Sequence, residues 1–165
     1  MTDVSDVDVM DDTGQKPPPI DVIYALVVDD EPNNQDFLVR LLQQAKLEVK
    51  GASDAKAALA IAEELQDKLK LVMVDYKLPD QSGIELIRSL RERLPNAKLV
   101  MATMFDDRSK MRDAFAAGCS AFLVKPHGFM ELFRMVQPAI SDPTIFDKLD
   151  NLIFDQYGKR TWRGG

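Results

Sequence analysis

A run of four apolar residues followed by an acid constrains the fold of this chain more than any other feature. Residues 71–74 (LVMV) are bounded by turn-forming residues, so the run is too short for a helix and lacks the polar alternation of a half-exposed strand. It predicts a strand buried on both faces, as in a parallel sheet that helices cover on both sides. Asp75 follows at the carboxyl edge, where open α/β sheets collect their reactive groups. A carboxylate placed there is partly desolvated and needs positive charge nearby.

Similar apolar runs alternate with helical patterns along the chain. Strands are expected at residues 23–28, 48–52 (a weaker candidate), 71–74, 99–102 and 121–124, with an amphipathic or alanine-rich helix after each. Ser53 is expected to cap the second of these helices. Five strands alternating with helices predict a doubly wound five-stranded parallel sheet of the α/β class. A site shared by the first and third strands favours the strand order 2-1-3-4-5.

Composition divides the 165 residues into one domain and two flanking segments. Residues 1–20 hold five aspartates against Lys16, which accounts for −4 of the formal charge of −6, and contain three consecutive prolines. This segment is predicted to be a disordered acidic leader, followed by a domain over residues 21–138 and an extension over residues 139–165. The near-neutral domain argues against nonspecific nucleic-acid binding.

The same composition indicates a compartment. No apolar run approaches the length of a membrane-spanning helix, and the acidic amino terminus does not resemble a secretory signal. Cys119 is the only cysteine and is expected to be a small core residue, which agrees with a reducing environment. We therefore expect a cytoplasmic protein that binds neither membrane nor DNA.

The extension carries helix signals of its own. Asp142 suits an N-cap, Pro143 the first helical position and Gly158 the end of a helix. The apolar residues between them follow helical spacing, so an amphipathic helix is predicted at about residues 143–157. Such a helix needs a cover, which is either its own domain or a partner, including a second copy in a homodimer.

Polar residues at the predicted strand ends form a constellation: Asp29, Asp30, Asp75, Thr103 and Lys125. Carboxylates gathered in one pocket attract a hard divalent cation, and Mg²⁺ shares its coordination with carboxylate and phosphate oxygens. Attack by the Asp75 carboxylate on a phosphoryl donor requires charge neutralisation on three oxygens. The metal, Lys125 and the Thr103 hydroxyl can supply it. Taken singly, Asp29 and Asp30 could be helix-capping acids, Thr103 a strand-end hydroxyl and Lys125 a solvated charge.

The sequence resembles the response-regulator receiver domain of two-component signalling. The resemblance covers about residues 24–136 and rests on LVVDDEP, VDYKLPDQSG, VMAT and FLVKP, all in order and spacing. It implies the flavodoxin-like receiver fold and a stand-alone response regulator without a DNA-binding output domain, a signalling phosphoacceptor and not a substrate-processing enzyme. The expected partners are a histidine kinase or histidine phosphotransfer protein and an unidentified output protein.

The resemblance also assigns roles to residues. It implies phosphorylation of Asp75 and Mg²⁺ bound by Asp30, Asp75 and the backbone carbonyl of Lys77, with Asp29 acting through a coordinated water. It further implies a cis peptide bond between Lys125 and Pro126.

Switching and access residues follow from the same resemblance. Thr103 would move toward the phosphoryl group and Phe122 would turn inward, although an aromatic residue in a buried strand is also a normal core residue. Met104, Lys77 and Phe105 border the site and are expected to control the access of water, which favours a long-lived phosphoryl group. His127 is the only histidine, so the phosphoryl group must come from another protein.

Three alternatives belong to other classes. A haloacid-dehalogenase-type phosphatase would need Asp–x–Asp after the first strand, whereas Glu31 lies two residues after Asp29. A transcription factor would need a DNA-binding domain, for which the residues after Pro138 leave no room. A receiver that signals without phosphate is disfavoured by the complete set of site residues.

Overall fold

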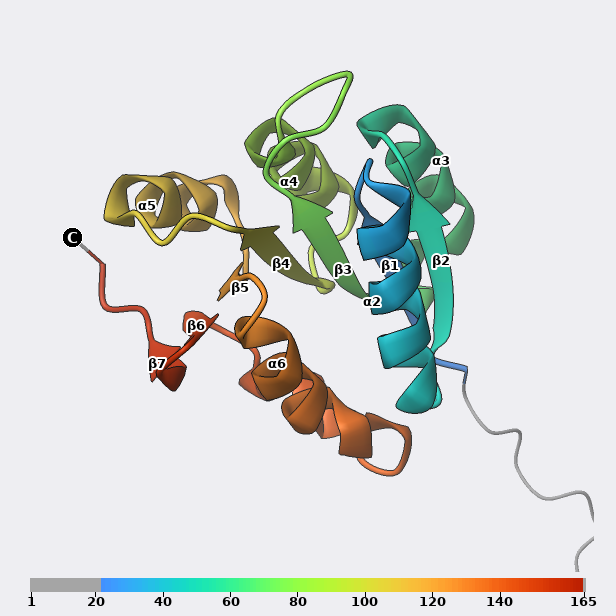
Figure 1. Ribbon diagram of the computed structural model, residues 1–165. Coiled ribbons are helices and arrows are strands. Elements are labelled where there is room, and N and C mark those ends of the chain that lie inside the picture. The colour runs from blue at the N-terminus through green and yellow to red at the C-terminus, as the bar shows by residue number, and fades with distance from the viewer. Residues whose placement is uncertain (1–21, 165) are drawn as a thin grey trace, which may run out of the picture.

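The computed structural model describes residues 22–164, so the predicted leader lies outside the described residues. One sheet organises the fold (Figure 1), with strand order β2-β1-β3-β4-β5-β6-β7. The strands are β1 (Tyr24–Val28), β2 (Glu48–Ala52), β3 (Leu69–Asp75), β4 (Lys98–Thr103), β5 (Ala121–Val124), β6 (Leu152–Asp155) and β7 (Gly158–Thr161). The first five are parallel and in the predicted order 2-1-3-4-5, which confirms the predicted fold class. β6 adds a parallel strand to β5, and β7 pairs antiparallel with β6.

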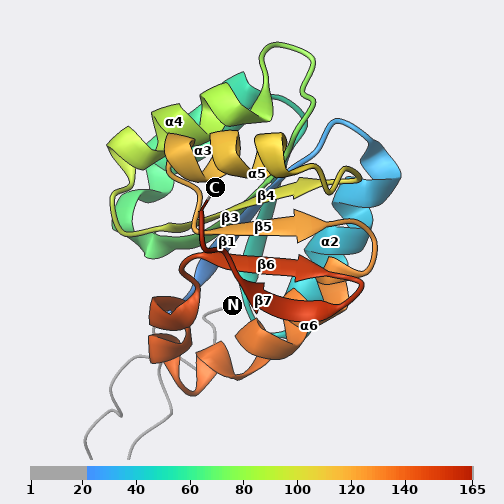
Figure 2. The ribbon, with the colours of Figure 1, turned by 90° about the vertical axis from the view of Figure 1, so that its left-hand side faces the viewer.

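Helices cover both faces of the sheet (Figure 2). They are α2 (Pro32–Gln44), α3 (Ala55–Leu65), α4 (Gly83–Arg93), α5 (Arg108–Ala117) and α6 (Gly128–Val136), with short 3-10 helices η1 (Gln66–Lys68), η2 (Gln137–Ile140) and η3 (Pro143–Lys148). The buried side chains of α3, α4 and α5 form one core on one face, and those of α2 and α6 form a second core on the other. The central strands β1, β3 and β4 contribute to both cores, which explains their uninterrupted apolar sequences. Within residues 22–164, no helix is long and apolar enough to cross a membrane.

Local chemistry sets the helix ends. Pro32 occupies the first turn of α2, and Asp107 caps α5 through the backbone amide of Lys110. Gly118 ends α5 in the left-handed conformation, with φ of 113°. The expected cap at Ser53 is wrong by one residue, because the side chain of Asp54 accepts the hydrogen bond from Ala57 N instead.

The C-terminal segment differs from its prediction. The proposed helix over residues 143–157 is wrong: η3 ends at Lys148, and residues 152–161 form the β6–β7 hairpin. The predicted start is confirmed: the Asp142 side chain accepts a hydrogen bond from Thr144 N, and Pro143 is the first residue of η3. Asn151 then adopts a left-handed conformation, with φ of 57°, which ends any helical path before the apolar run of β6.

The apolar residues assigned to that helix do pack, but on their own domain. Leu149 and Phe154 are fully buried in the core beneath α6, and Ile153 joins the opposite core. Buried residues between positions 139 and 154 therefore belong to the same two cores, and within the described residues the sheet has seven strands where five were predicted. The suggested homodimer through a C-terminal helix loses its structural basis.

Candidate functional site

Parallel pairing brings the acidic ends of β1 and β3 side by side. Val28 pairs with Val74, so Asp29 and Asp75 leave adjacent strands at the same edge. Asp29 is only 2% exposed, Asp75 is partly exposed, and Asp30 is exposed at the rim. One carboxylate oxygen from each of these three residues lies within 4.8 Å of the others. The structure thus brings together the three predicted metal-binding carboxylates.

Lys125 links two of these carboxylates. Its Nζ donates to Asp75 Oδ1 at 3.1 Å and to Asp29 Oδ2 at 3.2 Å, although these residues lie 50 and 96 positions away in the sequence. The Lys125 side chain is only 10% exposed, so the alternative of a solvated surface charge is wrong. The Lys125–Pro126 peptide bond is cis, as predicted.

The electrostatics of Asp75 reflect competing effects. Burial raises the pKa of the Asp75 carboxyl above its usual value, Lys125 lowers it through its charge and hydrogen bond, and the Asp29 carboxylate raises it again. The net direction is upward. Three carboxylates share this pocket with the single ammonium group of Lys125, which is a condition under which a bound cation is stabilising.

The donor set fits a hard divalent cation. Three carboxylates from two neighbouring strand ends offer only oxygen ligands, and no histidine or cysteine belongs to the cluster. Oxygen ligands of this kind suit Mg²⁺ or Ca²⁺ better than softer metals. Lys77, whose carbonyl was predicted as a further ligand, lies two residues after Asp75 and forms an isolated bridge with Ser82.

Thr103 lies at the end of β4, between the strand ends that carry Asp75 and Lys125. It is 2% exposed, and its carbonyl accepts a hydrogen bond from Lys125 N at 2.7 Å. Its hydroxyl accepts from Phe105 N at 3.3 Å, which ties the side chain to the loop before α5. Phe122 is fully buried in the core under α3, α4 and α5, so its core role is confirmed and its switching role stays a prediction.

The predicted access residues lie at the rim. Met104 is 75% exposed and Phe105 is 48% exposed, and Lys77 is also exposed. Phe105 has a partner that the sequence did not suggest: Lys110 Nζ lies 5.2 Å from its ring centroid and 5.5 Å from that of Tyr76. This cation bridges the loops that follow β3 and β4.

Two further residues shape the loop after Asp75. A Cβ on Gly83 would lie 2.2 Å from the carbonyl oxygen of Asp75, so only glycine permits this approach of α4 to the site. Asp80 accepts hydrogen bonds from the first two amides of α3, Ala55 N and Lys56 N, both at 2.9 Å. The glycine belonged to the sequence motif. The Asp80 contact spans 25 residues and had no local signal beyond a turn-forming aspartate.

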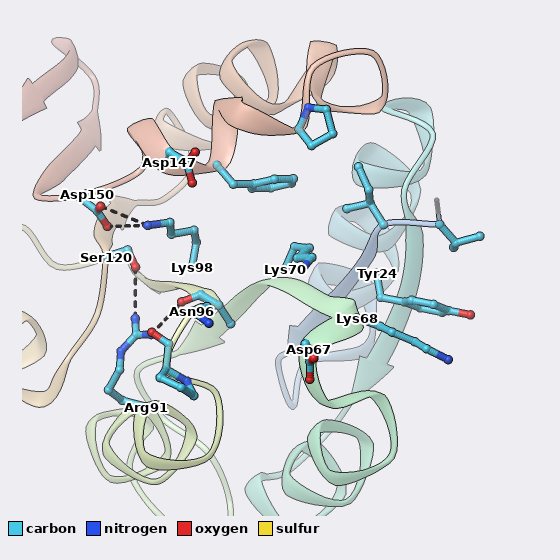
Figure 3. Close-up of a pocket in the computed structure, with 16 residues that line it drawn as sticks. Tyr24, Asp67, Lys68, Lys70, Arg91, Asn96, Lys98, Ser120, Asp147 and Asp150 are labelled. Atoms are coloured by element: carbon cyan, nitrogen blue, oxygen red, sulfur yellow. Dashed lines mark hydrogen bonds and ion pairs between the residues drawn. The ribbon is translucent and has the colours of Figure 1, made fainter. Parts of the chain in front are cut away.

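A cavity lies away from this site. A hollow of about 1020 Å³ lies at the amino ends of the strands, on the edge opposite Asp75 (Figure 3). Lys98 pairs with Asp150 in its wall, and Arg91 donates to Ser120 and to nearby backbone carbonyls. None of the three clustered carboxylates of the acidic pocket lines this cavity.

Two further residues, Cys119 and His127, take no part in the site. Cys119 is buried, and burial raises the pKa of its thiol to about 12, so it is a core residue. His127 is exposed at the start of α6.

Comparison with known proteins defines the class. The family model of the response regulator receiver domain matches residues 25–137, and the chain belongs to this family. The haloacid-dehalogenase alternative is thereby set aside.

Individual relatives agree with this assignment. An uncharacterized 14.6 kDa protein of Leptolyngbya boryana is 36% identical over 115 residues, covering 68% of this chain and 86% of that protein. The chemotaxis protein CheY of Thermotoga maritima is 30% identical over 102 residues, covering 61% of this chain and 83% of CheY. The response regulator protein PilR of Pseudomonas aeruginosa is 31% identical over 116 residues, which are 70% of this chain but only 26% of PilR. The chain thus spans about a quarter of PilR.

Solved structures show the same fold. A receiver domain protein from Clostridium thermocellum superposes with a TM-score of 0.66 and 26% identity, covering 75% of this chain and 98% of that one. The beryllofluoride-activated receiver domain of DrrB superposes with a TM-score of 0.64 and 26% identity, covering 73% of this chain and 98% of that one.

Proposed function

We propose that this protein accepts a phosphoryl group on Asp75 from a histidine kinase or a histidine phosphotransfer protein, with Mg²⁺ bound in the acidic pocket. The observation that carries this proposal is the double contact of Lys125 Nζ with Asp29 and Asp75 beside the exposed carboxylate of Asp30. Membership of the receiver family and the beryllofluoride-activated receiver among the similar structures support it.

Among the three carboxylates, Asp75 fits the role of nucleophile best. Asp29 is 2% exposed, and its two oxygens accept hydrogen bonds from Glu31 N and Lys125 Nζ. Asp30 is exposed and has no contact with the lysine in this structure. The side chain of Asp75 is 18% exposed, so a donor can reach an oxygen that is already oriented by Lys125.

The proposed reaction is a simple displacement at phosphorus. A carboxylate oxygen of Asp75 forms a bond to phosphorus as the bond from phosphorus to the imidazole nitrogen of the donor breaks, and the nitrogen keeps the electron pair. Lys125 lies where its ammonium group can neutralise one phosphoryl oxygen. The Thr103 hydroxyl accepts from Phe105 N, so its own proton is free to be donated to another.

The metal would be held by Asp30, Asp75 and the Lys77 carbonyl, with Asp29 acting through water. When bound, Mg²⁺ would supply positive charge to the third phosphoryl oxygen. The side chains of Asp29 and Asp30 would hold the ion beside the nucleophile. Removal of either is expected to raise the Mg²⁺ concentration that labelling requires.

The output is proposed to be a protein contact controlled by phosphorylation. Thr103 connects through only four residues to the start of α5, so a shift of its hydroxyl toward Asp75 alters the loop and the first turn of that helix. We infer that an output protein reads this change and that the chain turns over no substrate beyond its own phosphoryl group.

Beryllofluoride titration tests the proposal without a cognate kinase. Fluorine NMR should detect an adduct with the parent protein in the presence of Mg²⁺ and none with Asp75→Asn. Asp147→Asn, an exposed aspartate at the opposite edge of the sheet, is the matched control and should behave as the parent. An adduct that forms equally well with Asp75→Asn would overturn the assignment of the nucleophile.

A further inference from the structure

The residues after β7 form a strap across α5. The strap, residues 162–164, leaves the hairpin where Trp162 N donates to Asn151 O at 2.6 Å, and then runs beside α5, as both ribbon views show (Figures 1 and 2). The Trp162 ring stacks on Phe115 of α5 with a centroid distance of 5.1 Å and an interplanar angle of 9°. Stacked aromatic pairs stabilise a contact beyond the area that they bury.

Arg108 holds the strap at the other end of the helix. Its guanidinium lies 5.0 Å from the Trp162 ring centroid and donates from Nη2 to the carbonyl of Gly164 at 2.9 Å. Arg108 is the first residue of α5 and Phe115 lies two turns later, so the strap spans most of the helix. It is held by few contacts, and Trp162 remains partly exposed.

The helix under the strap is the one closest in sequence to the proposed switch. Thr103 ends β4, Phe105 N donates to its hydroxyl, and Asp107 caps α5 immediately before Arg108. If Thr103 shifts toward a phosphoryl group on Asp75, its hydrogen bond with Phe105 N transmits the shift to the loop of residues 104–107. Arg108 directly follows this loop, so its strap contacts adjoin the segment that phosphorylation would move.

We propose that the strap is an intramolecular restraint on α5. Phosphorylation of Asp75 weakens the contacts of Trp162 with Arg108 and Phe115, and these contacts in turn disfavour phosphorylation. This inference rests on the proposed function and adds its regulation. Coupling between two equilibria is reciprocal. If phosphorylation of Asp75 weakens the strap contacts, loss of those contacts must make phosphorylation more favourable. The strap also covers part of α5, so its release exposes Phe115 to a partner.

Trp162 is the only tryptophan of the chain, so its fluorescence reports on the strap directly. Acrylamide quenching of the parent protein should increase, and the emission should shift to the red, when Mg²⁺ and beryllofluoride are added. Asp75→Asn should show neither change. Fluorine NMR on the same samples records whether the adduct has formed.

The reciprocal test removes the ring. Trp162→Ala is expected to bind beryllofluoride, in the presence of Mg²⁺, about 3- to 10-fold more tightly than the parent, the factor that corresponds to the loss of one stacked aromatic pair. Trp162→Phe keeps a ring on Phe115 and should bind with nearly the parent affinity. Tyr157→Ala alters the most exposed aromatic of the hairpin, which contacts Arg160, and should bind as the parent does. Beryllofluoride titration followed by fluorine NMR measures each affinity.

The outcomes separate the two claims. An adduct on Asp75 with unchanged Trp162 quenching and an unchanged affinity for beryllofluoride in Trp162→Ala overturns the restraint and leaves the proposed function standing. Absence of the adduct in the parent protein overturns both. Tighter beryllofluoride binding in Trp162→Ala together with increased quenching in the parent supports the restraint.

Discussion

At the residue scale, Lys125 is the positive charge that pairs with two carboxylates of the site. It is the cation that compensates Asp29, which is almost completely buried, and it holds Asp75 in the same contact. Removing one partner from such a buried pair leaves the other charge uncompensated, which costs much more than the pair contributes. The same residue thus stabilises the metal-free protein and orients the proposed nucleophile.

Lys125→Ala is expected to lower the free energy of unfolding by about 3–5 kcal/mol in the absence of divalent metal. Mg²⁺ can replace the missing charge at the three carboxylates, so it should restore more stability to the variant than to the parent. Lys98→Ala breaks the more exposed Lys98–Asp150 pair and should cost no more than about 1 kcal/mol. Urea unfolding with and without Mg²⁺ measures both; equal losses in the two variants would contradict this account of Lys125.

Asp80 gives a prediction about pH. Its hydrogen bonds from Ala55 N and Lys56 N hold the pKa of its carboxyl below the usual 3.8. A lowered folded-state pKa contributes stability that is present above the unfolded value and is lost as pH falls through the folded value. Asp80→Asn should therefore be less stable than the parent at neutral pH, and the difference should shrink below about pH 4. Thermal melts across this range test it, and a difference that is constant with pH would refute it.

At the element scale, four of the first five strands were predictable because each is a short apolar run bounded by turn residues. β2 (EVKGA) is mostly exposed, which is why its sequence made it the weaker candidate. The β6 run Leu152–Asp155 carries the same apolar signal as those four, but the helical spacing of Ile145, Leu149 and Ile153 obscured it. Both patterns mark buried residues, and only the left-handed Asn151 and the parallel pairing with β5 decide between them. The first three residues of β6 each pair with a β5 residue 31 positions earlier, as in Ala121 and Leu152, and local periodicity does not contain such a tertiary contact.

The candidate site shows the same division. The identities of its residues were predictable because strand ends in a parallel sheet converge on one edge. The contacts of Asp80 with α3 and of Lys110 with the Phe105 and Tyr76 rings were not, because they depend on loop conformations that bring distant residues together.

Two aromatic residues of the hairpin differ in burial and should differ in their effect on stability. Phe154→Ala should lower the free energy of unfolding by about 3–5 kcal/mol, because the side chain is fully buried beneath α6 and leaves a cavity. Tyr157→Ala, at 77% exposure, should change it by less than about 0.5 kcal/mol. Chemical denaturation measures both values. If Phe154→Ala matched the parent, β6 would not be an integral strand of the sheet.

On the scale of the whole molecule, the two edges of the sheet differ in character. The carboxyl edge gathers Asp29, Asp30, Asp75 and Lys125, whereas the amino edge holds a cavity in whose wall Lys98 pairs with Asp150. The β6–β7 hairpin occupies the position beside β5, between α5 and α6 (Figure 2). Any partner that reads the state of Asp75 through α5 therefore meets a surface that includes the hairpin and the strap.

Phosphotransfer to Asp75 is the most direct test of the central claim. Purified histidine kinases that have autophosphorylated should be incubated with the parent protein, Asp75→Asn and Asp147→Asn in two parallel sets of reactions. One set contains Mg²⁺, and the other contains excess chelator from the start. We predict that at least one kinase transfers label to the parent and to Asp147→Asn, that peptide mass spectrometry places one phosphoryl group on Asp75, and that Asp75→Asn and the chelated samples stay unlabelled. Undiminished label on Asp75→Asn, or transfer that is indifferent to removal of Mg²⁺, would contradict the account.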